Sequence, residues 1–389
     1  MTTDWRDQVR PIAVNPGGIV PTDELIGREG LIAELLALAA APSHGALLLG
    51  DRRIGKTSLL RAIETPLREA GHLVVRVSAE TASLDTFGRT LLDGLRGDRR
   101  HRSWDVDLEG EVGVQAGPGR ILLRGKGKRR TEDTEVDLFA ACAQAARSSG
   151  EQLRVILLLD EITVLASELD PRDAREFLHT LRRARQELPE VVMFLAGSIG
   201  LHHALPGDRT GVNDLSEIHV DVLPDAAALL LAAGLLQGAR ISTDDPDAVA
   251  AAMVAQTSGF PYYLHGVAQL LAAHAGPTSP QTVAGIVDLA LQQDMWNTTH
   301  YDTRLDNYYG ADAAPAVRAV LDTIALAAAP LTVDDLLLSP AVAVQSVSRT
   351  DLIAMLRRLE ADHYLRRDGS ASMMASGLVR RIWLHVRRL

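Results

Sequence analysis

Cysteine is almost absent from this chain, which has one, Cys142, in 389 residues. A single cysteine excludes an internal disulfide and suits a reducing cytosol. Cys142 falls in the alanine-rich stretch 140–146, which favours a small buried thiol over a nucleophile. Long apolar runs are also missing, because the longest, 226–236, is too short to cross a bilayer. The first residues carry Asp4 and Asp7 and no apolar core, unlike a secretory signal. These features predict a cytoplasmic protein without a membrane span.

Positive charge is outweighed by negative charge. The formal net charge is −10, which argues against a protein coated overall in nucleic acid. Lysine is rare within the basic residues: only Lys56, Lys126 and Lys128 occur among 40. Lys56 is notable in a chain that almost always uses arginine, because some positions need a compact, rotatable ammonium and a planar guanidinium fits them poorly. Lys56 is therefore a candidate for a specific chemical role.

The surroundings of Lys56 predict a phosphate-binding loop. The chain reads G-x-x-x-x-G-K-T from Gly50 to Thr57, with an apolar run at 46–49 before it and a helical pattern after it. In that strand–loop–helix context the glycines let backbone N–H groups surround a polyphosphate, and the helix N-terminus faces the same anion. Lys56 would reach the β- and γ-phosphates, and the Thr57 hydroxyl would ligate Mg²⁺. The predicted nucleotide-binding residues here are Gly50, Asp51, Arg52, Arg53, Ile54, Gly55, Lys56, Thr57 and Ser58.

Acidic and polar residues follow two further apolar runs. The run 155–159 is typical of a strand buried on both faces of a parallel sheet, and it ends in Asp160 and Glu161. Asp160 would hold Mg²⁺ beside Thr57, and Glu161 would orient or deprotonate the attacking water. Ser198 follows the next apolar run and is a candidate to bond the γ-phosphate or the water. We expect the catalytic residues to be Glu161, Lys56 and Ser198, and the metal ligands to be Thr57 and Asp160.

Strands and helices alternate up to about residue 223, which predicts an α/β domain with a doubly wound parallel sheet. Within it, short alternating stretches flank Gly117-Pro118-Gly119 and predict a hairpin insertion over about 104–130. Its basic tail, 124–130, is a solvated edge or a contact for nucleic acid or a partner. The predicted domains are an N-terminal arm at 1–22, a P-loop domain at 23–223, a helical lid at 224–310 and a winged helix-turn-helix at 311–389.

The last segment has a charge of its own. Residues 349–389 contain nine arginines against four acidic residues, or +5, in a chain of −10 overall. A basic tail on an acidic body is consistent with a DNA-facing winged helix. Winged helices also dock proteins, and the arginines at positions 380, 381, 387 and 388 are equally consistent with the wet face of a terminal helix. Both kinds of partner remain open.

Several motifs together resemble the archaeal-type ATPase family, which lies near the STAND signalling ATPases and the archaeal origin-recognition ATPases within the AAA+-like group. They are Ile26-Gly27-Arg28-Glu29, GDRRIGKTSLL, VILLLDEI, LAGSIG and SGFPYYL, and the aromatic segment 296–310 and the C-terminal segment 363–384 fit as well. The resemblance implies that Ile26, Gly27 and Arg28 line the adenine pocket and that Ser198 is the sensor-one residue. It also implies that Pro261, in Gly259-Phe260-Pro261, couples the lid to the nucleotide. The one candidate for an arginine finger is Arg209, and its placement is weak.

The sequence therefore predicts a Mg²⁺-dependent P-loop ATPase that binds ATP and ADP and acts as a nucleotide-controlled switch. One alternative is an ATP-loaded DNA-binding protein of the origin-recognition or transcription-regulator type. Another is a scaffold that assembles on ATP, as a homo-oligomer or with a protein partner, and signals through that partner. A small-molecule kinase is disfavoured, because nothing resembles an acceptor pocket and the winged helix would be unexplained.

Overall fold

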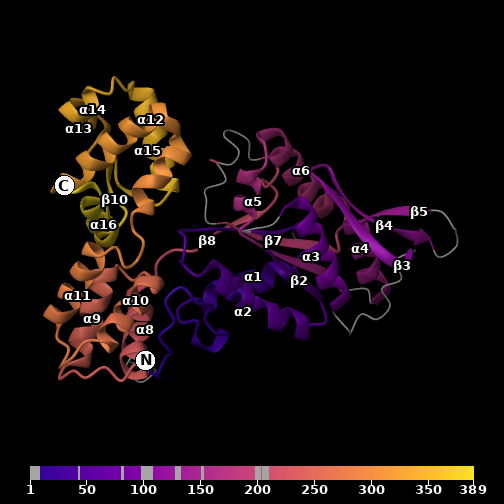
Figure 1. The fold of residues 1–389 in the computed structure, drawn as a ribbon, viewed down its shortest axis with the longest axis horizontal. Helices are drawn as coiled ribbons and strands as arrows, with labels where there is room; N and C mark the ends of the chain where they lie inside the picture. Colours follow the sequence, from indigo (N-terminus) through magenta and orange to yellow (C-terminus); the bar gives the residue numbers. More distant parts are fainter. Residues whose placement is uncertain are drawn as a thin grey trace. The chain divides into compact units, whose positions relative to one another are not determined.

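The computed structural model describes residues 9–42, 44–79, 83–97, 108–127, 133–149, 153–197, 203 and 210–389. Contacts within these residues divide the chain into two units, which Figure 1 shows as a ribbon. The first, called the sheet unit, is Ile19–Asp221. The second, called the helical unit, joins the arm residues up to Gly18 to Val222–Leu389.

A five-stranded parallel sheet forms the centre of the sheet unit. Its spatial order is β2-β6-β7-β1-β8, so β7 separates β1 from β6. The predicted P-loop α/β fold is thereby confirmed. The apolar runs of β6 and β7 are buried at every position, as expected for strands covered on both faces. The strands are β1 (Gly45–Leu49), β2 (Leu73–Ser78), β6 (Val155–Asp160), β7 (Val191–Ala196) and β8 (Ser216–His219).

Helices cover both faces of this sheet (Figure 1). On one face Leu157 and Met193 share a core with Phe87, Phe139 and Phe177, which come from three different helices. Alternate strand residues face the other way, towards α1 and α2, because side chains alternate along a strand. The helices are α1 (Glu29–Ala40), α2 (Lys56–Glu69), α3 (Leu84–Gly97), α4 (Leu138–Ser149), α5 (Ile162–Glu168) and α6 (Pro171–Glu187), after a short η2 (Thr22–Glu24).

The predicted hairpin insertion is present and has a third strand. β3 (Leu108–Gly117) and β4 (Arg120–Gly127) pair antiparallel around the glycine turn, and β5 (Asp133–Asp137) pairs with β4. The helix α4 starts directly after β5, at Leu138. β5 was missed because Asp-Thr-Glu-Val-Asp has one apolar residue and pairs only at an edge.

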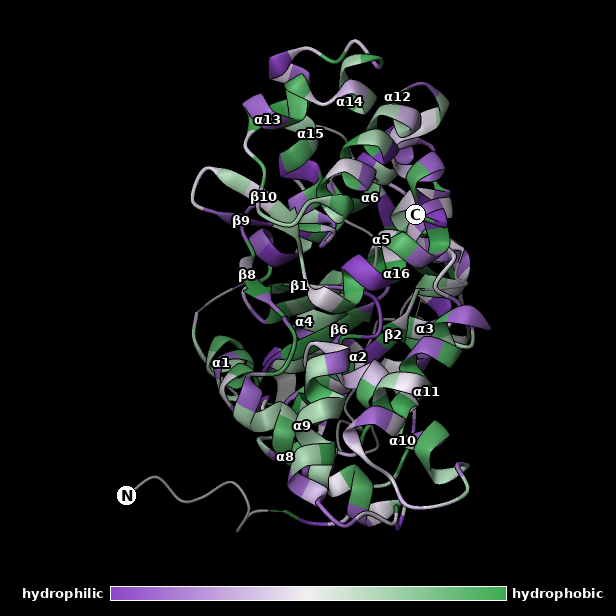
Figure 2. Cartoon of the chain, turned by 90° about the vertical axis from the view of Figure 1, so that its left-hand side faces the viewer, coloured by the Kyte–Doolittle hydropathy of each residue, from purple (hydrophilic) through white to green (hydrophobic). Residues whose placement is uncertain are grey.

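Four antiparallel-packed helices open the helical unit after the connection from β8. Asp245 caps α9 through its side chain, and Ser279 forms a capping box with Thr282 on α11. Figure 2 shows how hydrophobic α8 and α9 are along most of their length. The bounds are α8 (Asp225–Gly238), α9 (Pro246–Thr257), α10 (Pro261–Ala272) and α11 (Pro280–Gln292).

The N-terminal arm packs on these helices. The Ile12 N–H donates to the carbonyl of Gly234 at 2.9 Å, and the Ile12 side chain is buried. A methyl group added at Gly238 would lie 1.9 Å from the Ile12 carbonyl oxygen. Two glycines one helical turn apart therefore leave the space on α8 that the arm backbone fills. Nothing in the sequence analysis anticipated this contact.

A compact C-terminal region completes the helical unit. The long helix α12 bends at Gly310, whose φ is 75°, so its second half starts near the predicted domain boundary. An isolated antiparallel bridge joins Leu331 to Ser372 of β10, beside the two-stranded sheet of β9 and β10. The elements are α12 (His300–Leu326), α13 (Val333–Leu338), α14 (Pro340–Ala343), α15 (Arg349–Ala361), β9 (Leu365–Asp368), β10 (Ala371–Met374) and α16 (Gly377–Arg387).

The last helix fastens this region to the preceding helices. Arg381 on α16 bonds Asp288 of α11 at 2.6 Å and also bonds Gln256 of α9. The Leu378 N–H donates to Ser258 Oγ at 3.3 Å, at the end of α9. The segments that we predicted as separate lid and winged-helix domains thus belong to one unit by contact. None of the helices among the described residues combines the length and hydropathy that crossing a bilayer requires.

Candidate functional site: the phosphate loop

The loop between β1 and α2 has the backbone conformation that its glycines permit. Gly50 and Gly55 have φ values of 156° and 109°, and Arg53 is left-handed at 64°. A methyl group at Gly50 would lie 2.4 Å from the carbonyl oxygen of Val220, just after β8. Gly50 is therefore required both for its conformation and for this close approach. Ile54 is buried beneath the loop, whereas Arg52 and Arg53 are exposed.

Lys56 lies inside the loop. Its Nζ donates to the carbonyl oxygens of Gly50 at 2.8 Å and of Asp51 at 2.7 Å. Burial lowers the pKa of Lys56, while the carboxylates of Glu161, Asp51 and Asp160 act in the opposite direction. The ammonium is thus held at the first turn of α2, the place where a helix N-terminus and a lysine can together face an anion.

Asp160, at the end of β6, contacts the loop although β7 lies between β6 and β1. The Thr57 hydroxyl donates to Asp160 Oδ2 at 2.6 Å, although β7 lies between the strands that precede these residues. Burial raises the pKa of Asp160, and the hydrogen bond from Thr57 partly offsets that effect. A hydroxyl and a carboxylate at this separation are hard oxygen donors of the kind that Mg²⁺ prefers, so the residues present fit that ion.

Glu161 ends the strand in a strained conformation. Its φ is 54° in the left-handed region, and its N–H donates to Asp160 Oδ1 at 3.1 Å. A non-glycine residue held there costs about 1–3 kcal/mol, which the surrounding structure must offset. The turn at Glu161 starts α5 directly after β6, which keeps both carboxylates at the loop edge of the sheet. Such strain is common where a site needs a side chain in a fixed place.

Arg28 makes contacts within the sheet unit, and its predicted place in the adenine pocket stays a prediction. Its side chain is buried, and Nη2 donates to the Asp221 carbonyl at 2.5 Å and to the Ile54 carbonyl at 3.4 Å. Burial lowers its pKa, while Asp221 and Glu29 oppose the shift. Gly27 has a φ of 71°, and its N–H donates to Glu29 Oε1 at 3.1 Å. Arg28 thus ties the phosphate loop to the end of the sheet unit, with the half-buried Ile26 nearby in sequence.

Three further predicted positions are Ser198, Arg209 and Pro261. Ser198 and Arg209 are outside the described residues, so their predicted roles stay predictions. The chain before Ser198 is tightly packed, because a methyl group at Gly197 would lie 2.2 Å from Thr163 Oγ1 of α5. Pro261 is the first residue of α10 in the helical unit, after Gly259, whose φ is 71°. The carbonyl of Gly259 accepts from the Leu223 N–H at 3.0 Å.

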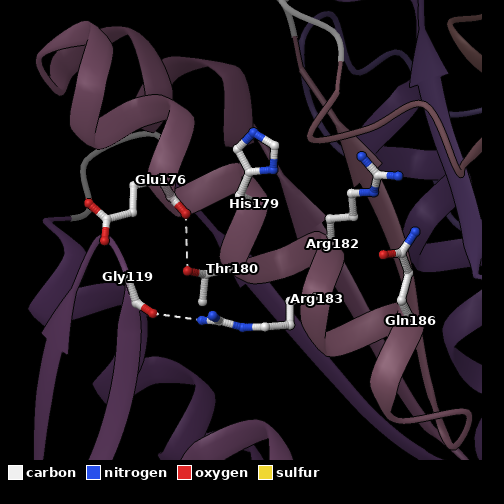
Figure 3. Close-up of a pocket in the computed structure, with 7 residues that line it drawn as sticks. All are labelled: Gly119, Glu176, His179, Thr180, Arg182, Arg183 and Gln186. Atoms are coloured by element: carbon white, nitrogen blue, oxygen red, sulfur yellow. Dashed lines mark hydrogen bonds between the residues drawn. The ribbon is translucent and has the colours of Figure 1, made fainter.

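A cavity of about 350 Å³ lies elsewhere in the sheet unit, between α6 and the turn of the insertion. In Figure 3 the Arg183 side chain reaches the Gly119 carbonyl, at 2.9 Å, while Thr180 bonds within its own helix. Thr180 also donates to the Pro118 carbonyl at 2.9 Å. Arg182 donates to the Thr210 carbonyl at 2.6 Å. These bonds dock the insertion on α6, and no residue of the phosphate loop lines this cavity.

Residues 24–194 match the family of the AAA ATPase domain. The sheet unit has the P-loop NTPase α/β fold, and the match supports an ATPase domain similar to that family. No curated protein matches the chain.

Several solved structures match the chain at low sequence identity. A Walker-type ATPase of Pyrococcus abyssi, PABY2304, is 18% identical with a TM-score of 0.64, covering 93% of this chain and 96% of that one. A Drosophila ORC structure bound to DNA is 14% identical with a TM-score of 0.45, covering 93% and 94%. A Thermotoga maritima RuvB is 16% identical with a TM-score of 0.41, covering 91% and 94%. The similarity to the first shows a shared fold over nearly the whole chain.

Proposed function

We propose that this protein is a Mg²⁺-dependent ATPase that works as a nucleotide-controlled switch. The observation that carries the proposal is the 2.6 Å hydrogen bond between Thr57 and Asp160, beside the buried ammonium of Lys56. A strand-end carboxylate and a loop hydroxyl meet there although β7 separates their strands. The match of residues 24–194 to the AAA ATPase domain supports the same chemistry.

Each group has a role in this reaction. Lys56 would bind the β- and γ-phosphate oxygens, and Thr57 and Asp160 would hold Mg²⁺, which neutralises charge on the phosphates. Glu161 would accept the proton of the attacking water. The water oxygen bonds to the γ-phosphorus, the bond from that phosphorus to the β–γ bridging oxygen breaks, and ADP and inorganic phosphate leave. Ser198, the predicted sensor-one residue, would donate a hydrogen bond to the γ-phosphate.

Two substitutions separate binding from chemistry. Lys56→Ala removes the phosphate-binding ammonium, so we expect calorimetry to show ATP affinity lowered by about 10- to 100-fold. Glu161→Gln keeps the size but not the basicity of the side chain, so binding should persist while kcat falls by about 10²- to 10⁴-fold. Glu168→Gln, at the exposed end of the same helix, is the matched control and should hydrolyse normally. Normal turnover by Glu161→Gln would contradict the assignment.

A second candidate function is DNA contact by the C-terminal region. From α12 to β10 the order is a helix, the bridge at Leu331, three helices and a hairpin, which supports a winged helix. In that arrangement α15 would be the recognition helix, and its exposed Arg357 and Arg358, with Arg366 on β9, supply positive charge. Several neighbouring arginines are already ion-paired, such as Arg349 with Asp334. The cationic surface is therefore small, and protein docking is the alternative outcome.

A further inference from the structure

A second cavity, of about 170 Å³, lies in the C-terminal region of the helical unit. Ile324 on α12, Met374 on β10 and the connection 327–330 give it an apolar lining. Ile324 and Met374 are buried, whereas Ala328 and Ala329 are exposed, so the cavity meets the surface along this connection. A cavity of about 150 Å³ with an apolar lining is large enough to bind benzene. This one therefore has room for one aliphatic or aromatic side chain.

Two exposed arginines line the same cavity. Arg366 is on β9, directly opposite Met373 of β10 in the antiparallel pair, and Arg380 is on α16. Arg380 Nε donates to the Ala325 carbonyl at 2.7 Å, which holds this side chain at the end of α12. Within the described part of the chain, neither the Arg366 guanidinium nor the Nη atoms of Arg380 have a hydrogen-bond or ion-pair partner. Both arginines therefore have donors left for a carboxylate, which a guanidinium bonds through two parallel hydrogen bonds.

Apolar surface continues beside the cavity. Leu326 lies in the sequence between Ile324 and Ala327, which both line the cavity. Thr323 Oγ1 lies 3.3 Å from Ser339 Oγ, and Figures 1 and 2 show α12, α13 and α14 close together. The three most exposed large apolar side chains among the described residues belong to these helices or their ends: Leu326 at 59%, Leu338 at 81% and Val344 at 80%. Exposed apolar surface of this extent is typical of a binding site.

Charge and shape favour an acidic protein segment as the occupant. Residues 349–389 carry +5, and the two arginines at the cavity have donors left, so this surface complements carboxylates. A nucleic acid duplex brings phosphates but keeps its bases stacked, and a small carboxylate would leave the three exposed apolar side chains uncovered. The described residues that line the cavity include none from α15, so only Arg366 belongs both to this surface and to the one considered for DNA.

We propose that the C-terminal region docks a segment of another protein that presents an apolar side chain beside an aspartate or a glutamate. The apolar side chain fills the cavity, and the neighbouring carboxylate bonds Arg366 and Arg380. The backbone around them covers the exposed apolar side chains of α12 to α14. We call the cavity, its two arginines and these three side chains the C-terminal docking surface. The proposal goes beyond the ATPase assignment and stands whether or not the chain hydrolyses ATP.

Peptide selection on the full chain tests the proposal. A phage-displayed library of random 12-residue peptides is bound to the immobilised protein, and peptides that also bind the Ala328→Glu variant are removed. Ala328 is exposed at the cavity, so this substitution adds a repelling carboxylate without disturbing the core. We expect the remaining peptides to share an aromatic or aliphatic residue within two positions of an acidic one. Fluorescence anisotropy of a labelled selected peptide then measures its affinity.

Variants on each side of the cavity locate the contact. Arg366→Gln and Arg380→Gln should each weaken peptide binding by about 10-fold, because each loses a charged hydrogen bond. Replacing the acidic residues of the peptide by their amides should have a similar effect. Ala361→Glu adds the same charge at the exposed end of α15, outside the cavity, and is the matched control that should bind normally. In methyl-methionine NMR spectra the signals of Met373 and Met374 should shift with the peptide.

Several results would overturn the proposal. One is a selection that leaves no peptide specific for the wild type over Ala328→Glu. Another is unchanged affinity in both arginine variants. Displacement of the peptide by a random-sequence DNA duplex would assign the surface to nucleic acid instead. Equally effective displacement by 4-methylpentanoate would make it a site for a small carboxylate, and self-association that Ala328→Glu abolishes would make it a contact between two copies of this chain.

Discussion

Three ionisable residues, Lys56, Asp160 and His265, are buried where water would otherwise stabilise their charges. Burial lowers the pKa of Lys56 and raises the pKa of Asp160. In both cases burial disfavours the charged form of the side chain, which is the form that binds ATP or Mg²⁺. Their nearness to each other partly offsets this effect, as does the hydrogen bond from Thr57. The site is therefore arranged so that ligands of opposite charge gain from entering it.

His265 makes the attachment of the arm depend on pH. Burial lowers its pKa to about 4, and its Nδ1 accepts the Asn15 N–H, which only the neutral ring can do. A depressed histidine pKa means that its stabilisation is complete above about 6.5 and is lost as pH falls towards 4. We expect a loss of about 3 kcal/mol across that range at most. Urea titrations at several pH values measure it, and His265→Gln should flatten the profile; an unchanged slope would contradict this reading.

At the scale of elements, a buried ion pair joins α6 to the segment before β8. Arg185 is fully buried and bonds both oxygens of Asp214, at 2.8 and 3.1 Å, and the Gly211 carbonyl at 2.9 Å. Bonding to Arg185 holds the pKa of Asp214 below its usual range, although burial opposes this. The pair therefore fixes the chain that follows the segment containing Ser198.

Breaking this pair on one side should be costly. Arg185→Met leaves the Asp214 carboxylate without its partner, so we expect the free energy of unfolding to fall by about 3–5 kcal/mol. Adding Asp214→Leu to the same chain removes the orphaned charge and should restore much of the loss. Chemical denaturation of the two variants measures the difference. Equal stability of the single variant and the wild type would show that the pair contributes little.

How far the elements could be predicted depended on their apolar runs. The strands ending at Asp160 and Ala196 were predictable, because five or six consecutive apolar residues leave few alternatives in an α/β chain. The short α5 and the polar β5 were missed, since neither has enough apolar residues to show a period. The site positions of Lys56, Thr57 and Asp160 followed from motif spacing. The role of Arg28 in holding Asp221 did not, because it depends on a carbonyl nearly two hundred residues away.

At the scale of the whole molecule, charge is segregated along the chain. The last 41 residues carry +5 while the chain as a whole is at −10, and ion pairs take up part of that positive charge. Of the exposed arginines outside these ion pairs, Arg357, Arg358 and Arg366 lie on α15 and β9, and Arg380 and Arg388 lie on α16 and at its C-terminal end. A nucleic acid would therefore meet few cations here, and its binding should weaken only moderately with salt.

Salt dependence tests DNA contact by this surface. If Arg357, Arg358 and Arg366 each meet a phosphate, the logarithm of the binding constant should fall with the logarithm of salt at a slope of about −2 to −3. Arg357→Ala should reduce that slope by about 1. Arg349→Gln, which removes an ion-paired arginine, is the control and should leave it unchanged. Absence of binding at low salt would favour a protein partner instead.

The binding of the arm to α8 has a consequence during synthesis of the chain. Ile12 leaves the ribosome early, but Gly234, which accepts its N–H, is translated 222 residues later. At bacterial or eukaryotic elongation rates this delay is about 10–45 s. During that time Ile12, which ends up 1% exposed, lacks the surface of α8 that covers it. Nascent chains of this protein should therefore leave Ile12 open to chaperones until α8 emerges.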